Sequence, residues 1–71
     1  MNELIRLLET NGLLTNQLRA DYELMEDLDF EESMVCNFLE RVENVVNSLL
    51  DRDGYLVDKI FYCISKIRGE L

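Results

Sequence analysis

The side chains of this protein best suited to chemistry are the carboxylates of residues 21–32. The segment reads Asp-Tyr-Glu-Leu-Met-Glu-Asp-Leu-Asp-Phe-Glu-Glu and holds seven carboxylates, with no basic residue between Arg19 and Arg41. Large apolar side chains are interspersed among these charges, which fits docking on a surface that is basic and partly apolar. The residues expected to contact such a partner are Tyr22, Glu23, Glu26, Asp27, Asp29, Phe30 and Glu31.

The same carboxylates have a second interpretation that needs no partner. Acidic side chains just before a helix, and within its first turn, stabilise the positive end of the helix dipole. Asp27, Asp29, Glu31 and Glu32 stand before or at the start of the next predicted helix, so helix capping alone can account for them. The sequence leaves docking and capping both open.

The sequence contains few of the residue types that enzymes use for catalysis. The chain has no His for general-base catalysis and no Gly-rich phosphate loop. Carboxylates are plentiful, but 71 residues enclose little space in which their pKa could be raised. Cys36 and Cys63 are too few for a disulfide framework, and they make a poor start for a zinc site. We therefore expect no enzyme, no cofactor and no metal.

Composition limits the size of the protein and the classes of its partners. Residues 1–71 allow one domain, and a hydrophobic fraction of 48% argues against disorder. A net charge of −8 opposes direct binding to nucleic acid or to an anionic membrane, and it suits a basic protein partner. Because small scaffolds often need a supplement to their core, a homodimer is expected. Free thiols without a signal peptide point to the cytoplasm.

Two helical segments are indicated in the first half of the chain. Asn2 is a candidate cap for the first, and Asn11-Gly12 can end it because both residues tolerate a positive φ. Thr15 is a candidate cap for a second segment, in which Leu18, Tyr22 and Met25 share one face. Whether the two segments are separate helices, or one helix with a break, stays open.

The second half of the chain predicts two longer helices. Asp29 and Glu32 resemble a capping box that opens an amphipathic helix of roughly 20 residues. Gly54 can take the left-handed position at its end, and Asp53 can cap the last helix. The fold class is therefore all-α: a small helical bundle of three to four helices with a C-terminal antiparallel helical hairpin. The predicted core consists of Val35, Phe38, Leu39, Val42, Val46, Leu49, Leu56, Ile60, Ile64 and Ile67.

Two segments resemble known motifs. Asp51, Asp53, Gly54 and Leu56 resemble the middle of a calcium-binding EF-hand loop, but Leu49 and Ile60 occupy its first and last ligand positions, so calcium binding is not expected. Residues 28–34, followed by an amphipathic helix, resemble the prosthetic-group region of acyl carrier proteins. That resemblance would imply phosphopantetheine on Ser33, although the family's Asp-Ser-Leu is here Glu-Ser-Met, one residue later relative to Phe30.

These observations favour a small, acidic, non-enzymatic protein-binding module. It would act as an accessory regulator, an inhibitor or a chaperone-type adaptor, as bacterial and phage accessory proteins do. The mechanism would be charge-steered docking of the acidic segment on a basic partner. One alternative is an acidic nucleic-acid mimic that blocks a DNA- or RNA-binding protein. A further alternative is a carrier protein of the acyl-carrier type.

Overall fold

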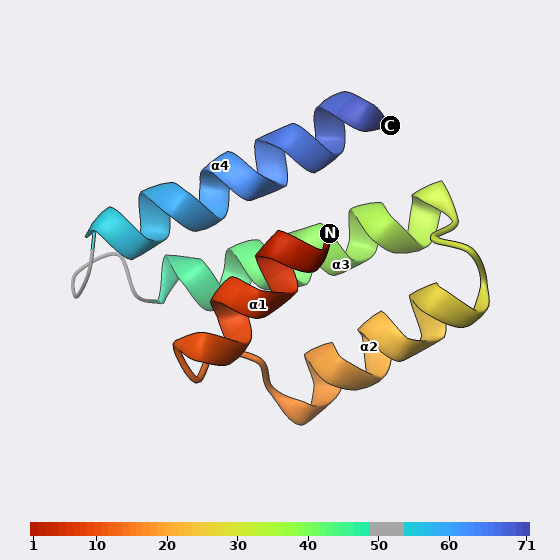
Figure 1. Ribbon diagram of the computed structural model, residues 1–71, viewed down its shortest axis with the longest axis horizontal. Coiled ribbons are helices and arrows are strands. Elements are labelled where there is room, and N and C mark those ends of the chain that lie inside the picture. Colours follow the sequence, from red (N-terminus) through yellow and green to blue (C-terminus); the bar gives the residue numbers. More distant parts are fainter. Residues whose placement is uncertain (49–53) are drawn as a thin grey trace.

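The computed structural model describes residues 1–48 and 54–71 and contains four helices (Figure 1). They are α1 (Asn2–Thr10), α2 (Asn16–Asp27), α3 (Glu32–Asn47) and α4 (Gly54–Glu70). The described residues include no strand. The predicted all-α class and small helical bundle are therefore confirmed. The open question about the first half is also answered, because residues 11–15 separate α1 from α2.

Each helix packs against a neighbour in a simple order. α2 lies on α3, α3 lies on α4, and α1 returns to pack on α4. In Figure 1, α3 and α4 run in opposite directions, which is consistent with the predicted hairpin. The first and last helices of the chain are thus neighbours in space, although most of the sequence separates them.

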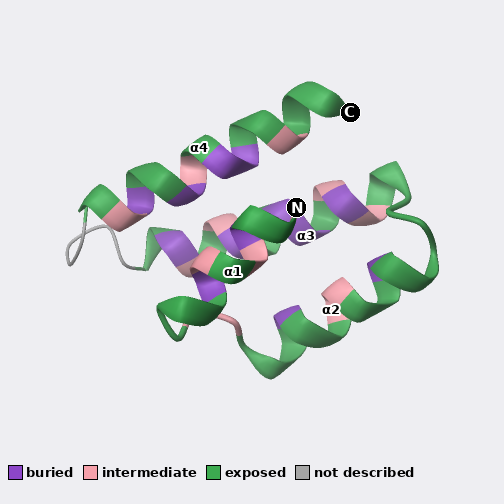
Figure 2. Ribbon diagram, viewed as in Figure 1, coloured by how far each residue is buried: buried purple, intermediate pink, exposed green. Residues whose placement is uncertain are grey.

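A single apolar core takes residues from all four helices, as the purple segments of Figure 2 show. Seven of the ten predicted core residues are buried, Leu56 and Ile67 are half-buried against the core, and Leu49 lies outside the described residues. The prediction omitted α1 and α2, which bury four side chains in the same core. The buried residues are Leu4, Leu8, Leu18, Met25, Val35, Phe38, Leu39, Val42, Val46, Val57, Ile60, Cys63 and Ile64.

The end of α1 and the start of α2 follow the predicted local chemistry. Gly12 has a φ of +70° and its N–H donates to the carbonyl of Glu9, while the N–H of Leu13 donates to the carbonyl of Leu8 at 2.8 Å. This pair of bonds is the Schellman motif, which favours glycine at the left-handed position. Thr15 then caps α2, because its Oγ1 accepts from the N–H of Leu18 at 3.1 Å.

Three of the predicted helix boundaries are wrong or shifted. Asn2 belongs to α1 itself, whose N-cap is Met1, and no side chain caps that end. The capping box does not form, because Asp29 is left-handed at the end of α2; α3 begins later and spans 16 residues. Gly54 is the first residue of α4 rather than the residue after a helix end. The predicted cap at Asp53 lies outside the described residues.

Candidate protein-docking surface

The backbone between α2 and α3 makes an unusual turn. The N–H of Asp29 donates to the carbonyl of Glu26 at 3.3 Å, and the N–H of Phe30 donates to the carbonyl of Met25 at 2.8 Å. This is the same Schellman motif that ends α1, but Asp29 stands where Gly12 stood. Asp29 has a φ of +54° and Phe30 a φ of +56°. Such conformations cost about 1–3 kcal/mol each in non-glycine residues.

Tyr22 holds this turn against the rest of the molecule. Its ring lies 6.0 Å from that of Phe30 and 6.4 Å from that of Phe38, both tilted, and its hydroxyl donates to Asn2 Oδ1 at 3.0 Å. Burial raises the pKa of the Tyr22 hydroxyl, and the charge of Glu26 raises it further. Tyr22 was predicted as an anchor for a partner, but its ring and hydroxyl are already engaged within the chain.

The acidic segment of residues 21–32 forms few ion pairs for the charge that it carries. Outside it, Glu3 pairs with Lys66, Glu9 with Arg19, and Glu43 with Arg68, and each pair joins two helices. None of six carboxylates between residues 23 and 32 forms an ion pair with a described residue. We call this group the acidic corner; its members are Glu23, Glu26, Asp27, Asp29, Glu31 and Glu32.

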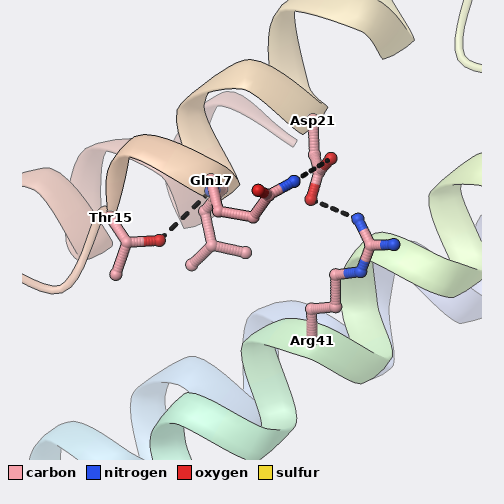
Figure 3. Close-up of polar contacts among 5 residues, drawn as sticks. Thr15, Gln17, Asp21 and Arg41 are labelled. Carbon is pink, nitrogen blue, oxygen red and sulfur yellow. Dashed lines mark hydrogen bonds and ion pairs between the residues drawn. The ribbon is translucent and has the colours of Figure 1, made fainter.

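Asp21, the first acid of the segment, is the exception. Its Oδ1 accepts from Nε2 of Gln17 at 3.2 Å, and its Oδ2 pairs with the guanidinium of Arg41 on α3 (Figure 3). The carboxylate is 17% exposed. Asp21 therefore joins α2 to α3 and does not belong to the unpaired corner.

Two leucines that the sequence analysis did not select lie beside the corner. Leu24 and Leu28 are each 49% exposed, and they are spaced four residues apart along α2 and its C-cap. Phe30 is 39% exposed. Leu24 also lines a hollow of about 170 Å³ between α2 and α3, together with Met34 and Asn37. Their positions off the Leu18–Tyr22–Met25 face gave a signal in the sequence, but only the packing of α2 shows that about half of each side chain stays exposed.

The serine and the two cysteines considered in the sequence lie at separate places in the fold. Ser33 is the second residue of α3, and its hydroxyl donates to Glu31 Oε1 at 3.1 Å. Cys36 is half-buried and Cys63 is buried. Burial raises the pKa of the Cys63 thiol, and the nearby charge of Glu3 acts in the same direction. Over residues 1–48 and 54–71, no three potential ligands among His, Cys, Asp and Glu converge on a metal-sized site.

Comparison with protein-family models, with curated proteins and with solved structures finds no match to this chain. None of the helices in the described part of the chain is long and apolar enough to cross a membrane. The geometry of the corner is therefore the basis for a functional proposal.

Proposed function

We propose that this chain is a non-enzymatic protein-binding module whose acidic corner docks on a basic partner protein. One observation carries the proposal: two acids of the corner lie in the last turn of a helix, at its unfavourable end. Glu26 and Asp27 occupy that turn of α2, which has no basic residue, and Glu23 lies directly before it. The helix dipole disfavours negative charge there by about 0.3–1 kcal/mol per group, so capping does not account for these acids.

Capping does account for part of the corner. Glu32 lies in the first turn of α3 and Glu31 is its N-cap residue, so both carboxylates stabilise the positive end of that helix. We thus assign the acids of α2 to docking and the acids at the start of α3 to helix capping. The acids of α2 lower stability in the free protein, and a partner's cations would offset their mutual repulsion.

Docking would proceed in two physical steps. The unpaired carboxylates steer a basic surface toward the corner, which raises the association rate at low ionic strength. Burial of Leu24 and Leu28 then supplies the short-range affinity, since each apolar side chain contributes about 1.5–3 kcal/mol on full burial. Phe30 lies at the edge of this contact, partly covered by Tyr22. The exposed leucines favour a protein partner over pure phosphate mimicry, which needs charge alone.

Two double variants test this function. Asp27→Asn/Leu28→Ser changes the corner, whereas Glu40→Gln/Asp58→Asn changes two exposed acids elsewhere that also lack ion pairs with described residues. Proteins captured from an extract by the unaltered chain and by the control variant, but not by the corner variant, are the expected partners. Their binding is then measured with purified components over a salt series.

Two results would contradict the proposal. Equal capture by the corner variant would show that the corner does not bind, and equal loss in the control would show nonspecific charge attraction. Adding DNA or RNA distinguishes the nucleic-acid mimic from a regulator or adaptor. If the nucleic acid displaces the chain from its partner, the corner occupies the partner's nucleic-acid-binding groove. A regulator or adaptor surface would be insensitive to that competitor.

A further inference from the structure

The described cations of this chain fall into two groups. Arg19, Arg41, Lys66 and Arg68 each pair with an acid on another helix. Arg6 and Lys59 form no ion pair with any described residue, although the chain has about twice as many acids as bases. Both line the same groove, of about 380 Å³, between α1 and α4.

The groove combines this charge with an apolar floor. Leu7 is half-buried and Cys63 is buried in its wall, while Tyr62 stands at the rim with 64% of its surface exposed. The Nζ of Lys59 also lies 5.0 Å from the centre of the exposed Tyr55 ring, within the range of a cation–π contact. Glu3 also lines the groove, and its carboxylate pairs with Lys66, so Arg6 and Lys59 leave a surplus of positive charge beside the apolar side chains. The groove therefore suits a ligand that is both acidic and apolar.

We propose that the groove receives the acidic corner of a second copy of this chain. Leu24 and Leu28, four residues apart, form one ridge of α2, and such ridges are the usual anchors when a helix lies in an apolar groove. Glu23 and Asp27 each precede one of these leucines, and they are the carboxylates that we expect to pair with Arg6 and Lys59. The unpaired acids and the unpaired cations of the molecule thus complement each other.

The contact is heterologous, since two different surfaces of the same chain meet. Each associated pair retains one free corner and one free groove, so the expected homodimer is the first member of a head-to-tail series. Two copies that each have a net charge of −8 repel one another, so association is weak and depends on salt. This inference does not rest on the proposed function, although an outside partner would compete with a second copy for the corner.

Solution mass over a concentration series, at low and high salt, tests the contact. The unaltered chain should exceed the monomer mass at low salt, and Arg6→Gln/Lys59→Gln should weaken association about tenfold or more. Asp27→Asn/Leu28→Ser should do the same, while Glu40→Gln/Asp58→Asn should associate like the unaltered chain. A mixture of the groove and corner variants should form a 1:1 heterodimer and nothing larger, because only one intact groove and one intact corner remain.

Restoration in the mixture also shows that both variants are folded. A chain that stays monomeric at low salt at every concentration would overturn the proposal. So would a groove variant that associates like the unaltered chain, or a mixture of the two variants that stays monomeric. The groove variant keeps its acidic corner, so it should still capture an outside partner when it no longer self-associates. That capture distinguishes a failure of the self-association proposal from a failure of the proposed function.

Discussion

At the scale of single residues, the clearest anomaly is the left-handed pair Asp29 and Phe30. Gly12 performs the same task at the end of α1 without a side chain to clash. In Asp29 the Cβ atom lies too close to the following carbonyl, at a cost of about 1–2 kcal/mol. The turn persists because Phe30 packs on Tyr22 and because the Schellman bonds satisfy the last carbonyls of α2.

We predict that Asp29→Gly stabilises the protein by about 1 kcal/mol, because glycine removes the left-handed penalty. Gly12→Ala should do the opposite, with a loss of about 1 kcal/mol, since its φ of +70° strains any Cβ atom. Asp29→Asn is the control for charge, because asparagine removes the carboxylate but keeps a Cβ. Urea denaturation at neutral pH measures all three. A gain in Asp29→Asn as large as in Asp29→Gly would assign the effect to charge rather than to backbone strain.

At the scale of helices, polar side chains tie neighbouring elements together. Three ion pairs and the Tyr22–Asn2 hydrogen bond join α1 and α2, α1 and α4, and α3 and α4. A fourth ion pair, between Asp21 and Arg41, joins α2 to α3. Most of these side chains are about half exposed, and exposed ion pairs contribute about 0.2–1 kcal/mol each. Their arrangement sets the register between helices, while burial of the core supplies the stability.

We predict that the link between α1 and α2 weakens at high pH. The pKa of Tyr22 is raised by burial, so the unfolded chain loses this proton first as the pH rises above about 10, and stability then falls. Below that range the contribution is fully present. Tyr22→Phe should lower stability by about 0.5–1.5 kcal/mol at pH 8 and flatten the alkaline fall. Tyr55→Phe, at an exposed site, is the control. Equal pH profiles for the two variants would remove Tyr22 as the cause.

Helix type and much of the core follow directly from the order of residues. The stripe from Val35 to Val46 has one period and one buried face, and Thr15 is a good cap whatever surrounds it. The boundary of α3 could not be predicted, because Asp29 satisfies two motifs equally well: an N-cap of α3 and a left-handed end of α2. Packing of Phe30 on Tyr22, which brings residues from two elements together, favours the second.

At the scale of the whole molecule, charge is unevenly distributed. Each of the four ion pairs joins two helices, whereas the acidic corner forms no ion pair with a described residue. The corner's carboxylates were visible in the sequence. The exposure of Leu24 and the convergence of Arg6 and Lys59 on one groove were not, because they depend on how α2 packs on α3 and α1 on α4.

We predict that added salt stabilises this protein. Screening weakens both the self-repulsion of a chain with net charge −8 and the four ion pairs, but the pairs are half exposed and contribute little. The melting temperature should therefore rise by a few degrees between about 0.02 and 0.5 M sodium chloride. Glu23→Gln/Asp27→Asn should show a smaller rise than Glu40→Gln/Asp58→Asn, which has the same net charge. A fall in the melting temperature would mean that the ion pairs outweigh the repulsion.

The packing of α1 on α4 also affects how the chain reaches its fold. α1 has nine residues, too few for a stable helix in isolation, and its Leu4 and Leu8 are buried in a core that α4 completes. During synthesis, α4 emerges from the ribosome after α1, α2 and α3. The leucines of α1 therefore wait for the helix that completes their core, and until it emerges they are open to chaperones and proteases.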